Sequence, residues 1–391
     1  MDENLTQPGD NPAPPPQPPP LRPTPQPIYT PPAYAPVVKK TGTGWKVVAI
    51  LAIALFLCSL IVNPFHALLG MMESGNALPT HNVVGPKLQE GLLKDNDSKN
   101  KIAVVPIEGV IMSQRTGRAY SMVDVVEEQL KRAEHDKSVK AVLLKVNSPG
   151  GEVLASDDIY KLIDEFHTRT GKPVVASMGS LAASGGYYVS APCQWIVANE
   201  LTITGSIGVI MHGYNFRGLM DKVGVRPETF KSGKFKDMLS PDKREEDITQ
   251  EERDMIQSMV NETFDKFKSV VAEGRGNAVK RNAGAASTNR PLADNWQQYA
   301  DGRVLSGKEA LKLGFVDELG NLDVAVVRTL KLAKITDANL VEYQPLFEIS
   351  DLFGMLGQSS EARTLKIDVG LDAPRLQLGR LYFLCPLVLP R

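Results

Sequence analysis

Residues 101–345 are predicted to form an α/β domain around a largely parallel sheet. Short apolar runs rich in β-branched residues alternate there with segments of helical periodicity. A strand that is covered on both faces reads as a continuous apolar run, and in α/β domains helices supply that cover. The predicted strands are 102–107, 141–146, 173–178 and 195–198, and the predicted helices include 121–134 and 154–169.

The tail before this domain, residues 1–44, is predicted to be disordered. Half of the 28 prolines in the chain lie between Pro8 and Pro36, in repeats such as PPPQPPPLRPTPQP. A segment without large apolar side chains cannot bury enough surface to offset the entropy of ordering it. We expect an extended, solvated spacer, with recognition by a proline-binding module as the alternative.

Residues 45–66 are predicted to be a membrane anchor. The uncharged run VVAILAIALFLCSLIV, with its flanking aromatic residues, approaches the roughly 20 residues needed to span hydrocarbon. A cleavable signal peptide is disfavoured because more than forty mostly polar residues precede the run. Lys39, Lys40 and Lys46 lie on its N-terminal side, so the positive-inside rule keeps the N-terminus in the cytoplasm. The chain is then a single-pass protein of the cytoplasmic membrane with an extracytoplasmic domain.

The segments on either side of the domain are predicted to be irregular. Residues 67–100 are predicted to be a linker, because Asn76–Lys101 is polar and contains Gly, Pro, Asn and Asp. Beyond residue 345, in the extension 346–391, the periodic pattern weakens, and Gly354–Leu378 is expected to hold loops and at most a short strand. Its apolar end, LYFLCPLVLP, is too short to cross a bilayer.

A long amphipathic helix is predicted to begin after Thr249. Thr249 and Glu252 have the spacing of a capping box, in which each side chain accepts the backbone N–H of the other residue. Gly274 is predicted to end the helix. Its apolar stripe is expected to pack in the core or against another subunit rather than to hold a cofactor. The stripe consists of Met255, Ile256, Met259, Val260, Phe264, Phe267 and Val271.

Composition excludes several classes of function. With 44 Lys and Arg against 45 Asp and Glu the chain is nearly neutral, so nucleic acid is not expected as a partner. Cys58, Cys193 and Cys385 are far apart and differently surrounded, which supports neither a disulfide framework nor a zinc site. No chemistry is therefore assigned to sulfur or to a metal.

Two clusters of small residues follow predicted strands, where an open α/β sheet places its binding crevice. The first is NSPGG, residues 147–151, directly after the strand 141–146. Gly150 and Gly151 allow backbone N–H groups to turn toward a ligand, so this loop is a candidate oxyanion hole. The alternative is an ordinary turn, because this composition is common in turns.

The second cluster, MGSLAASGGYY at residues 178–188, follows the strand 173–178. Ser184 has Ala before it and Gly after it, which suits a nucleophilic hydroxyl at the start of a helix. Small neighbours also leave room for the backbone of a peptide. The alternative is that the same small residues only permit close helix packing.

A serine nucleophile needs a base, and the sequence offers two candidates. Of the five histidines, His212 is the one worth considering, because the others lie in the flanking segments or near remote helix ends. The other candidate is a lysine in KSGKFKD, residues 231–237, which otherwise reads as a solvated loop. A lysine base must be neutral, so burial has to lower its pKa from about 10.4 toward 7–8. Ser206, in TGSIG, supplies a hydroxyl that can orient a neutral amine.

Taken together, five motifs resemble those of the bacterial signal peptide peptidase A family in its short, single-unit form. They are, in order, NSPGG, MGSLAASGGYYVS, TITGSIGVI, SGKFKDMLSP and DGRVLSGKEALKLGFVDELG, and the likeness spans residues 102–341. The resemblance implies a Clp/crotonase-like fold and a serine/lysine dyad. On this basis Ser184 is the nucleophile, Lys236 is the general base, and Ser206 positions the lysine amine.

The resemblance also implies the setting of the reaction. Backbone N–H groups around Gly150 and Gly151, with Gly185 in addition, would hold the oxyanion, and neither a metal nor a cofactor is needed. The substrates would be hydrophobic peptides at the membrane, chiefly remnant signal peptides. Members of the family assemble into rings whose dyad is completed between neighbouring subunits, so a homo-oligomer is expected.

Three other functions are also compatible with the sequence. A Clp-type protease would use His212 as the base of a Ser/His/Asp triad, since GVIMH is loosely similar to the corresponding strand of that family. A crotonase-type acyl-CoA enzyme would need an acidic residue, and neither glycine cluster contains one. A membrane scaffold would keep the fold without turnover.

Overall fold

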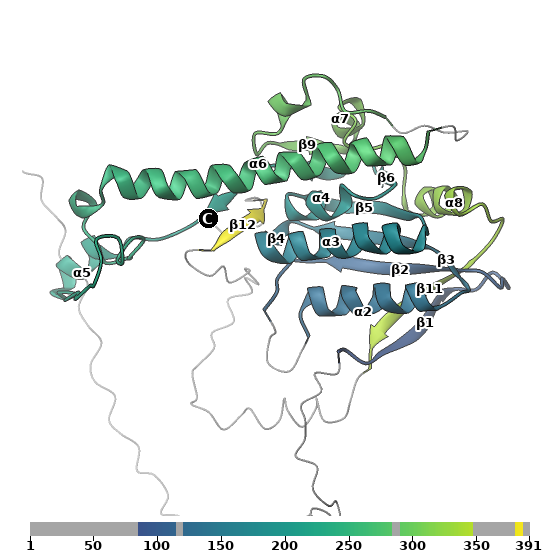
Figure 1. Cartoon of the computed structure of the whole chain (residues 1–391), viewed down its shortest axis with the longest axis horizontal. Helices are drawn as coiled ribbons and strands as arrows, with labels where there is room; N and C mark the ends of the chain where they lie inside the picture. The colour runs from purple at the N-terminus through teal and green to yellow at the C-terminus, as the bar shows by residue number, and fades with distance from the viewer. Residues whose placement is uncertain (1–84, 115–119, 284–289, 347–379, 386–391) are drawn as a thin grey trace, which may run out of the picture. The chain divides into compact units, whose positions relative to one another are not determined.

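The computed structural model describes residues 85–114, 120–283, 290–346 and 380–385. Its central feature is a nine-stranded sheet formed by β1 (Leu88–Lys94), β2 (Lys101–Glu108), β3 (Val139–Ser148), β5 (Val174–Ala183), β6 (Trp195–Ala198), β7 (Ile203–Gly205), β9 (Val304–Ser306), β10 (Glu318–Leu319) and β11 (Asn339–Pro345). The strand order is β1-β11-β2-β3-β5-β6-β10, and β7 pairs with β5 and β9 beside this row (Figure 1).

Parallel pairing of β2, β3, β5 and β6 forms the centre of the sheet and confirms the predicted α/β class. The apolar run of β2 is buried on both faces, with Ile102 and Val104 on one side and Ala103 and Val105 on the other. Full burial of a Val or Ile side chain contributes roughly 1.5–3 kcal/mol, so these doubly buried strands supply much of the driving force for folding. Because β1 pairs antiparallel with β11, the sheet as a whole is mixed.

Helices cover both faces of the sheet. The helices of the described residues are α2 (Met122–His135), α3 (Val153–Thr170), α4 (Gly185–Ser190), α5 (Arg217–Val223), α6 (Gln250–Arg281), α7 (Gly307–Lys312) and α8 (Leu322–Ala333), with 3-10 turns η1 (Glu245–Asp247) and η2 (Trp296–Tyr299). Val126 of α2, Ile159 of α3 and Phe267 of α6 belong to one core. Ala325 of α8 packs with Leu143 in a second core on the opposite face. The predicted helices 121–134 and 154–169 are confirmed as α2 and α3.

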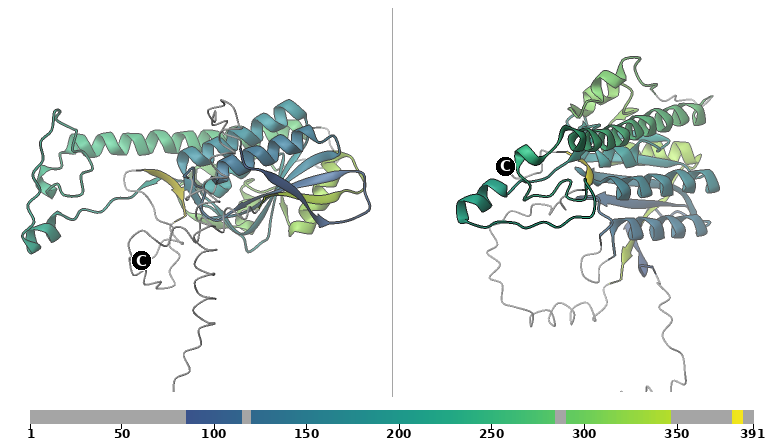
Figure 2. Two further views of the ribbon diagram at one scale, coloured as in Figure 1. Left: turned by 90° about the horizontal axis from the view of Figure 1, so that it is seen from below. Right: turned by 60° about the vertical axis from the view of Figure 1, so that its left-hand side comes forward.

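Helix α6 is longer than predicted. Its start is confirmed, because Thr249 accepts the backbone N–H of Glu252 and the Glu252 carboxylate accepts that of Thr249. The predicted end at Gly274 is wrong, since the helix continues to Arg281. A Cβ at Gly274 would stand 2.5 Å from the carbonyl oxygen of Ala191, so glycine is needed here for close packing against the end of α4. The N-terminal half of α6 extends away from the sheet toward α5 (Figure 1, Figure 2).

The folded region extends beyond the predicted boundaries at both ends. β1 lies inside the predicted linker, 67–100, and pairs with β11. Most residues of this strand are exposed, and Leu88 is its one buried residue, so its sequence lacks the pattern of a buried strand. The predicted extension, 346–391, contributes the strand β12 (Leu381–Leu384) to a second sheet. The order of that sheet is β4 (Gly150–Glu152), β12, β8 (Ile210–Met211).

The predicted Pro-rich tail, 1–44, and the predicted anchor, 45–66, lie outside the described residues. Within the residues that are described, no helix combines the length and the apolar character needed to cross a membrane. The anchor and its topology stay predictions from the sequence.

The ion pair between Arg275 of α6 and Asp317 is completely buried. The guanidinium donates to the carboxylate and to the carbonyl oxygen of Cys193, and Asp317 also accepts the N–H of Ile196. We expect Arg275→Ala to lower the free energy of unfolding by about 3–5 kcal/mol, because it leaves a carboxylate unpaired in the core. Chemical denaturation measures this loss.

Arg253→Ala is the matched control for this prediction. The Arg253 side chain is 48% exposed and that of its partner Glu245 is 76% exposed. Exposed pairs of this kind contribute at most about 1 kcal/mol. Equal losses of stability in the two variants would show that the buried ion pair contributes no more to stability than the exposed one.

Candidate active site

Ser184 lies in the sharp turn between β5 and α4. Its backbone has φ 55° and ψ −117°, a conformation that costs free energy for a residue with a side chain. The N–H of Ser184 donates to the carbonyl oxygen of Gly205 at 2.8 Å, which holds the turn against β7. Ser184 is 1% exposed, and its Oγ has no hydrogen-bond partner within the described part of the chain. Such a hydroxyl destabilises a fold by about 1–3 kcal/mol, so its presence here points to a functional role.

The glycine loop after β3 lies directly beside this turn. β3 and β5 are paired up to the point where both end. Gly150 has φ 98°, a conformation that residues with a Cβ rarely adopt. A Cβ at Gly185 would stand 3.0 Å from the Cα of Gly150 and 3.1 Å from the backbone nitrogen of Gly151. The three glycines predicted to surround the oxyanion are therefore in contact, next to Ser184.

The backbone N–H groups of these glycines are engaged differently. The N–H of Gly150 donates to the Oγ of Ser148 at 3.1 Å, so it already has an acceptor. Gly151 is paired with Phe383 of β12, and Gly185 begins α4. The first N–H groups of a helix have no acceptor within the helix. Of the three predicted donors, Gly150 fits the role least and Gly185 fits it best.

We expect Gly151→Ala to displace this loop. The added Cβ would stand 1.9 Å from the carbonyl oxygen of Ile111, a contact that requires the backbone to move. Overpacking of this kind lowers the free energy of unfolding by about 1–3 kcal/mol. The displaced loop should also reduce the rate of peptide hydrolysis by about tenfold or more. Thermal unfolding and hydrolysis assays measure the two effects. Gly276→Ala is the control, since nothing lies within 4 Å of that Cβ position; an equal loss of activity there would contradict the argument.

Ser206 lies close to the turn that carries Ser184. β7 runs parallel to β5, with Gly205 opposite Ala183, and Ser206 follows directly. Ser206 has φ 50° and is 3% exposed. Its N–H donates to the carbonyl oxygen of Arg303 at 2.7 Å, which fixes the turn. The structure thus brings the predicted nucleophile and the predicted base-orienting serine to the ends of two neighbouring strands.

Lys236 is not brought to Ser184 within one chain. It lies between α5 and α6, in the segment at the end of α6 that is far from the sheet (Figure 1), and it is exposed. Because the Oγ of Ser184 has no partner among the described residues, the two side chains are not hydrogen bonded. Within the described residues of one chain the predicted dyad is therefore not formed.

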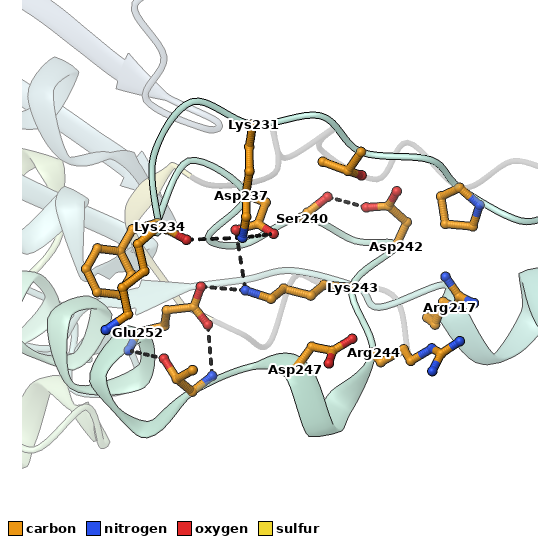
Figure 3. Close-up of a pocket in the computed structure, with 14 residues that line it drawn as sticks. Arg217, Lys231, Lys234, Asp237, Ser240, Asp242, Lys243, Arg244, Asp247 and Glu252 are labelled. Atoms are coloured by element: carbon orange, nitrogen blue, oxygen red, sulfur yellow. Dashed lines mark hydrogen bonds and ion pairs between the residues drawn. The ribbon is translucent and has the colours of Figure 1, made fainter.

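Ion pairs hold the segment that carries Lys236 (Figure 3). Lys243 bridges Asp237 and Glu252, and Lys231 pairs with Asp237 at 2.8 Å. The hydrogen bond from Lys243 is the main reason why the pKa of Glu252 lies below its ordinary value. The hydrogen bond from Lys231 likewise lowers the pKa of Asp237. Both carboxylates are therefore ionised at neutral pH, and the segment keeps its shape while Lys236 faces solvent.

None of the histidines in the described ranges is hydrogen bonded to the side chain of Ser184 either. His212 follows β8, is exposed, and packs edge-to-face with Tyr214 at 4.9 Å between ring centroids. His135 and His167 contact backbone carbonyl oxygens near their own helix ends. In the described ranges, no group of three or more His, Cys, Asp or Glu residues is arranged to hold a metal ion.

Glu152, directly after the paired glycines, was not singled out from the sequence. Its carboxylate accepts the N–H and the Oγ–H of Ser113 and pairs with Arg380. Burial raises the pKa of the Glu152 carboxyl, but the hydrogen bonds from Ser113 and the charge of Arg380 outweigh it and hold the pKa below its ordinary value. Its position in NSPGGE was the one available signal, and its partner Arg380 lies too far along the chain for spacing to reveal the pair.

Comparison with known proteins defines the class of this protein. The Clp protease family model matches residues 99–193, and the model of peptidase family S49 matches residues 167–336. Together with the sheet described above, these matches define a serine protease with a Clp protease-like α/β fold.

Three relatives narrow the class further. A putative signal peptide peptidase SppA of Enterococcus faecium is 37% identical over 265 residues, which are 66% of this chain and 71% of the relative. A putative protease of Synechocystis sp. is 34% identical over 70% of this chain and 89% of its own length. A putative protease of Methanocaldococcus jannaschii is 42% identical over 57% of this chain and 65% of its own length. The chain belongs to the signal peptide peptidase SppA family within the S49 peptidases.

Proposed function

We propose that the chain is a membrane-anchored serine endopeptidase that degrades remnant signal peptides and other hydrophobic peptides with a dyad of Ser184 and Lys236. The observation that supports this proposal best is the buried Oγ of Ser184, unpartnered in the described part of the chain, on a strained turn beside three glycines. The name of the Enterococcus relative, a putative signal peptide peptidase, supports the substrate class.

The proposed reaction passes through an acyl-enzyme. Neutral Lys236 of a neighbouring subunit takes the proton of Ser184, whose Oγ attacks the carbonyl carbon of the peptide. The N–H groups of Gly151 and Gly185 stabilise the oxyanion, by about 3–4 kcal/mol per donor. The protonated amine passes its proton to the leaving nitrogen as the peptide bond breaks. Water activated by the same lysine then releases the acyl group from Ser184, while the hydroxyl of Ser206 orients the amine.

A ring of identical subunits would complete this dyad. The arm that carries Lys236 consists of α5, residues 225–248 and the N-terminal half of α6. Leu219, Val223 and Phe230 on this arm are 60%, 64% and 91% exposed. Exposed large apolar side chains favour a contact with another protein, and a head-to-tail contact between identical subunits forms a ring where the rotation between subunits closes.

Labelling with a fluorophosphonate probe, followed by peptide mapping, tests this proposal. We expect the adduct on Ser184 in the intact oligomer and a strong reduction of labelling in Lys236→Ala. An adduct on another residue would refute the nucleophile. Undiminished labelling in Lys236→Ala, together with its loss in His212→Ala, would favour a Clp-type triad. Absence of labelling at every pH would favour a scaffold without turnover.

A further inference from the structure

The strand that leads to the candidate nucleophile contains a bulge. Val146 of β3 is opposite Met178 of β5, and the next pair is Ser148 with Ala182, so one residue of β3 faces three of β5. The other edge of β5 changes its partner at the same place, from β6 to β7. Backbone groups in a bulge lose their regular partners, and bulges next to active sites commonly re-aim a side chain. The conformation of this bulge therefore decides where the following turn is placed.

Two side chains bind the backbone at the start of the bulge. The Oγ1 of Thr202, just before β7, donates to the carbonyl oxygen of Gly179 at 2.8 Å. From the side of β3, the Oδ1 of Asn147 accepts the N–H of Leu181 at 3.2 Å. Thr202 is 1% exposed, so its hydrogen bond is sheltered from water. The bulge is thus held from both of its neighbouring strands.

Thr204 of β7 binds the end of the bulge. Its Oγ1 donates to the carbonyl oxygen of Ala182 at 2.6 Å, and its side chain is completely buried. The residues opposite Thr204 on the two adjacent strands, Ala182 and Leu305, belong to the apolar core. Burial of a hydroxyl in such surroundings costs free energy unless the hydroxyl is hydrogen bonded, and a valine of similar shape carries no such cost. What the hydroxyl adds at this position is the bond to Ala182, two residues before Ser184.

The residue after Thr204 holds the turn itself. Gly205 accepts the N–H of Ser184 at 2.8 Å, while Ser184 has φ 55°. A strained backbone persists only where the surrounding contacts determine it. Ser206 follows directly. Three successive residues of this segment therefore bind the chain before the candidate nucleophile, bind its N–H, and carry the hydroxyl proposed to orient the base.

We propose that Thr204 is a positioning residue of the candidate active site, and that its hydrogen bond to Ala182 holds Ser184 in its strained conformation beside the glycine loop. This inference rests on the proposed function, because it concerns the nucleophile of that site. Without the bond, residues 182–184 relax toward an unstrained backbone, and the Oγ of Ser184 moves relative to the oxyanion donors. A displacement of about 1 Å is enough to slow a reaction by about 10²-fold.

Thr204→Val in the full chain removes the hydroxyl and keeps the shape of the side chain. We expect kcat for a fluorogenic peptide to fall by about tenfold to a hundredfold, with KM within about twofold of the wild-type value. The rate at which a fluorophosphonate probe labels Ser184 should fall by the same factor, because labelling depends on the nucleophile and not on product release. Thr204→Ser keeps the hydroxyl and should restore both rates to within about threefold of wild type.

Thr329→Val is the matched control. Thr329 of α8 is also completely buried, and its Oγ1 donates to the carbonyl oxygen of Ala325, a residue of the core on the opposite face of the sheet, at 2.7 Å. Each valine variant loses one buried hydrogen bond, so the two should lose a similar free energy of unfolding. Thr329→Val should nevertheless keep kcat and the rate of labelling.

Hydrogen exchange of the Ser184 N–H reports on the turn without any reaction. In Thr204→Val this N–H should exchange about tenfold faster or more than in Thr329→Val, because the turn opens locally when its support is lost. Comparison of the two variants removes the effect of a general loss of stability, which both share.

Three results would overturn the inference even with Ser184 established as the nucleophile. They are equal kcat or equal exchange of the Ser184 N–H in the two valine variants, failure of Thr204→Ser to restore hydrolysis, and unfolding of Thr204→Val, which would give Thr204 a role in the fold alone. Faster exchange in Thr204→Val, in a chain whose wild-type form neither hydrolyses peptides nor reacts with the probe, would instead refute the proposed function and support the positioning of Ser184 by Thr204.

Discussion

Ser184→Ala is expected to abolish hydrolysis and to raise stability at the same time. Loss of the nucleophile should reduce kcat by roughly 10⁴-fold or more, because only positioning and oxyanion stabilisation are left. The substitution also removes a buried hydroxyl that has no partner among the described residues, so the free energy of unfolding should rise by about 1 kcal/mol. Hydrolysis assays and denaturant unfolding of one preparation measure both effects. Their opposite signs separate a catalytic residue from a structural one.

Ser190→Ala is the matched control for this variant. Ser190 is also completely buried, but its Oγ donates to the carbonyl oxygen of Gly186 at 2.8 Å. Its replacement should therefore lower the free energy of unfolding by about 1 kcal/mol and leave hydrolysis intact. Retained hydrolysis in Ser184→Ala would refute the nucleophile. An equal loss of stability in the two variants would show that the Ser184 hydroxyl is satisfied in the assembled protein.

The sequence predicts the fold well where burial leaves a local pattern. β2, β3 and β6 are apolar runs because both of their faces are covered, and each is found at its predicted position. β1 escapes prediction because it is an edge strand whose residues are mostly exposed. The end of α6 was wrongly predicted at Gly274, because glycine can either end a helix or allow close packing. A contact with Ala191, which spacing in the sequence does not reveal, decides between the two roles.

The candidate site also has parts that the local sequence predicts and parts that depend on contacts between remote residues. Ser184 and the three glycines follow strand ends, so the local sequence is sufficient to bring them together in one place. The position of β12 cannot be predicted from local sequence, because its pairing with β4 joins residues that are remote in the chain. Lys236 raises a different difficulty. Its proposed partner belongs to another subunit, and neither the pattern of one sequence nor the fold of one chain contains that contact.

Lys236→Ala is expected to lose hydrolysis, and mixing with Ser184→Ala is expected to restore it. Removal of a general base should reduce the rate by about 10²–10⁴-fold. Within one chain Lys236 is exposed on the arm while Ser184 is buried at the sheet, so a shared dyad needs one intact group from each of two neighbours. In an equal, random mixture of the two variants, roughly a quarter of the subunit contacts combine both intact groups. Hydrolysis after co-assembly measures the recovery.

Lys234→Ala is the matched control, since Lys234 lies on the same segment and pairs with the exposed Glu251. Lys234→Ala should hydrolyse peptides without a second variant, because the substitution removes only an exposed ion pair. A chain that carries both Ser184→Ala and Lys236→Ala supplies neither group, and it should restore nothing to either single variant. Failure of recovery in verified mixed oligomers would place the base in the same chain as Ser184. Full hydrolysis by Lys236→Ala alone would assign proton transfer to another group, with His212 as the first to test.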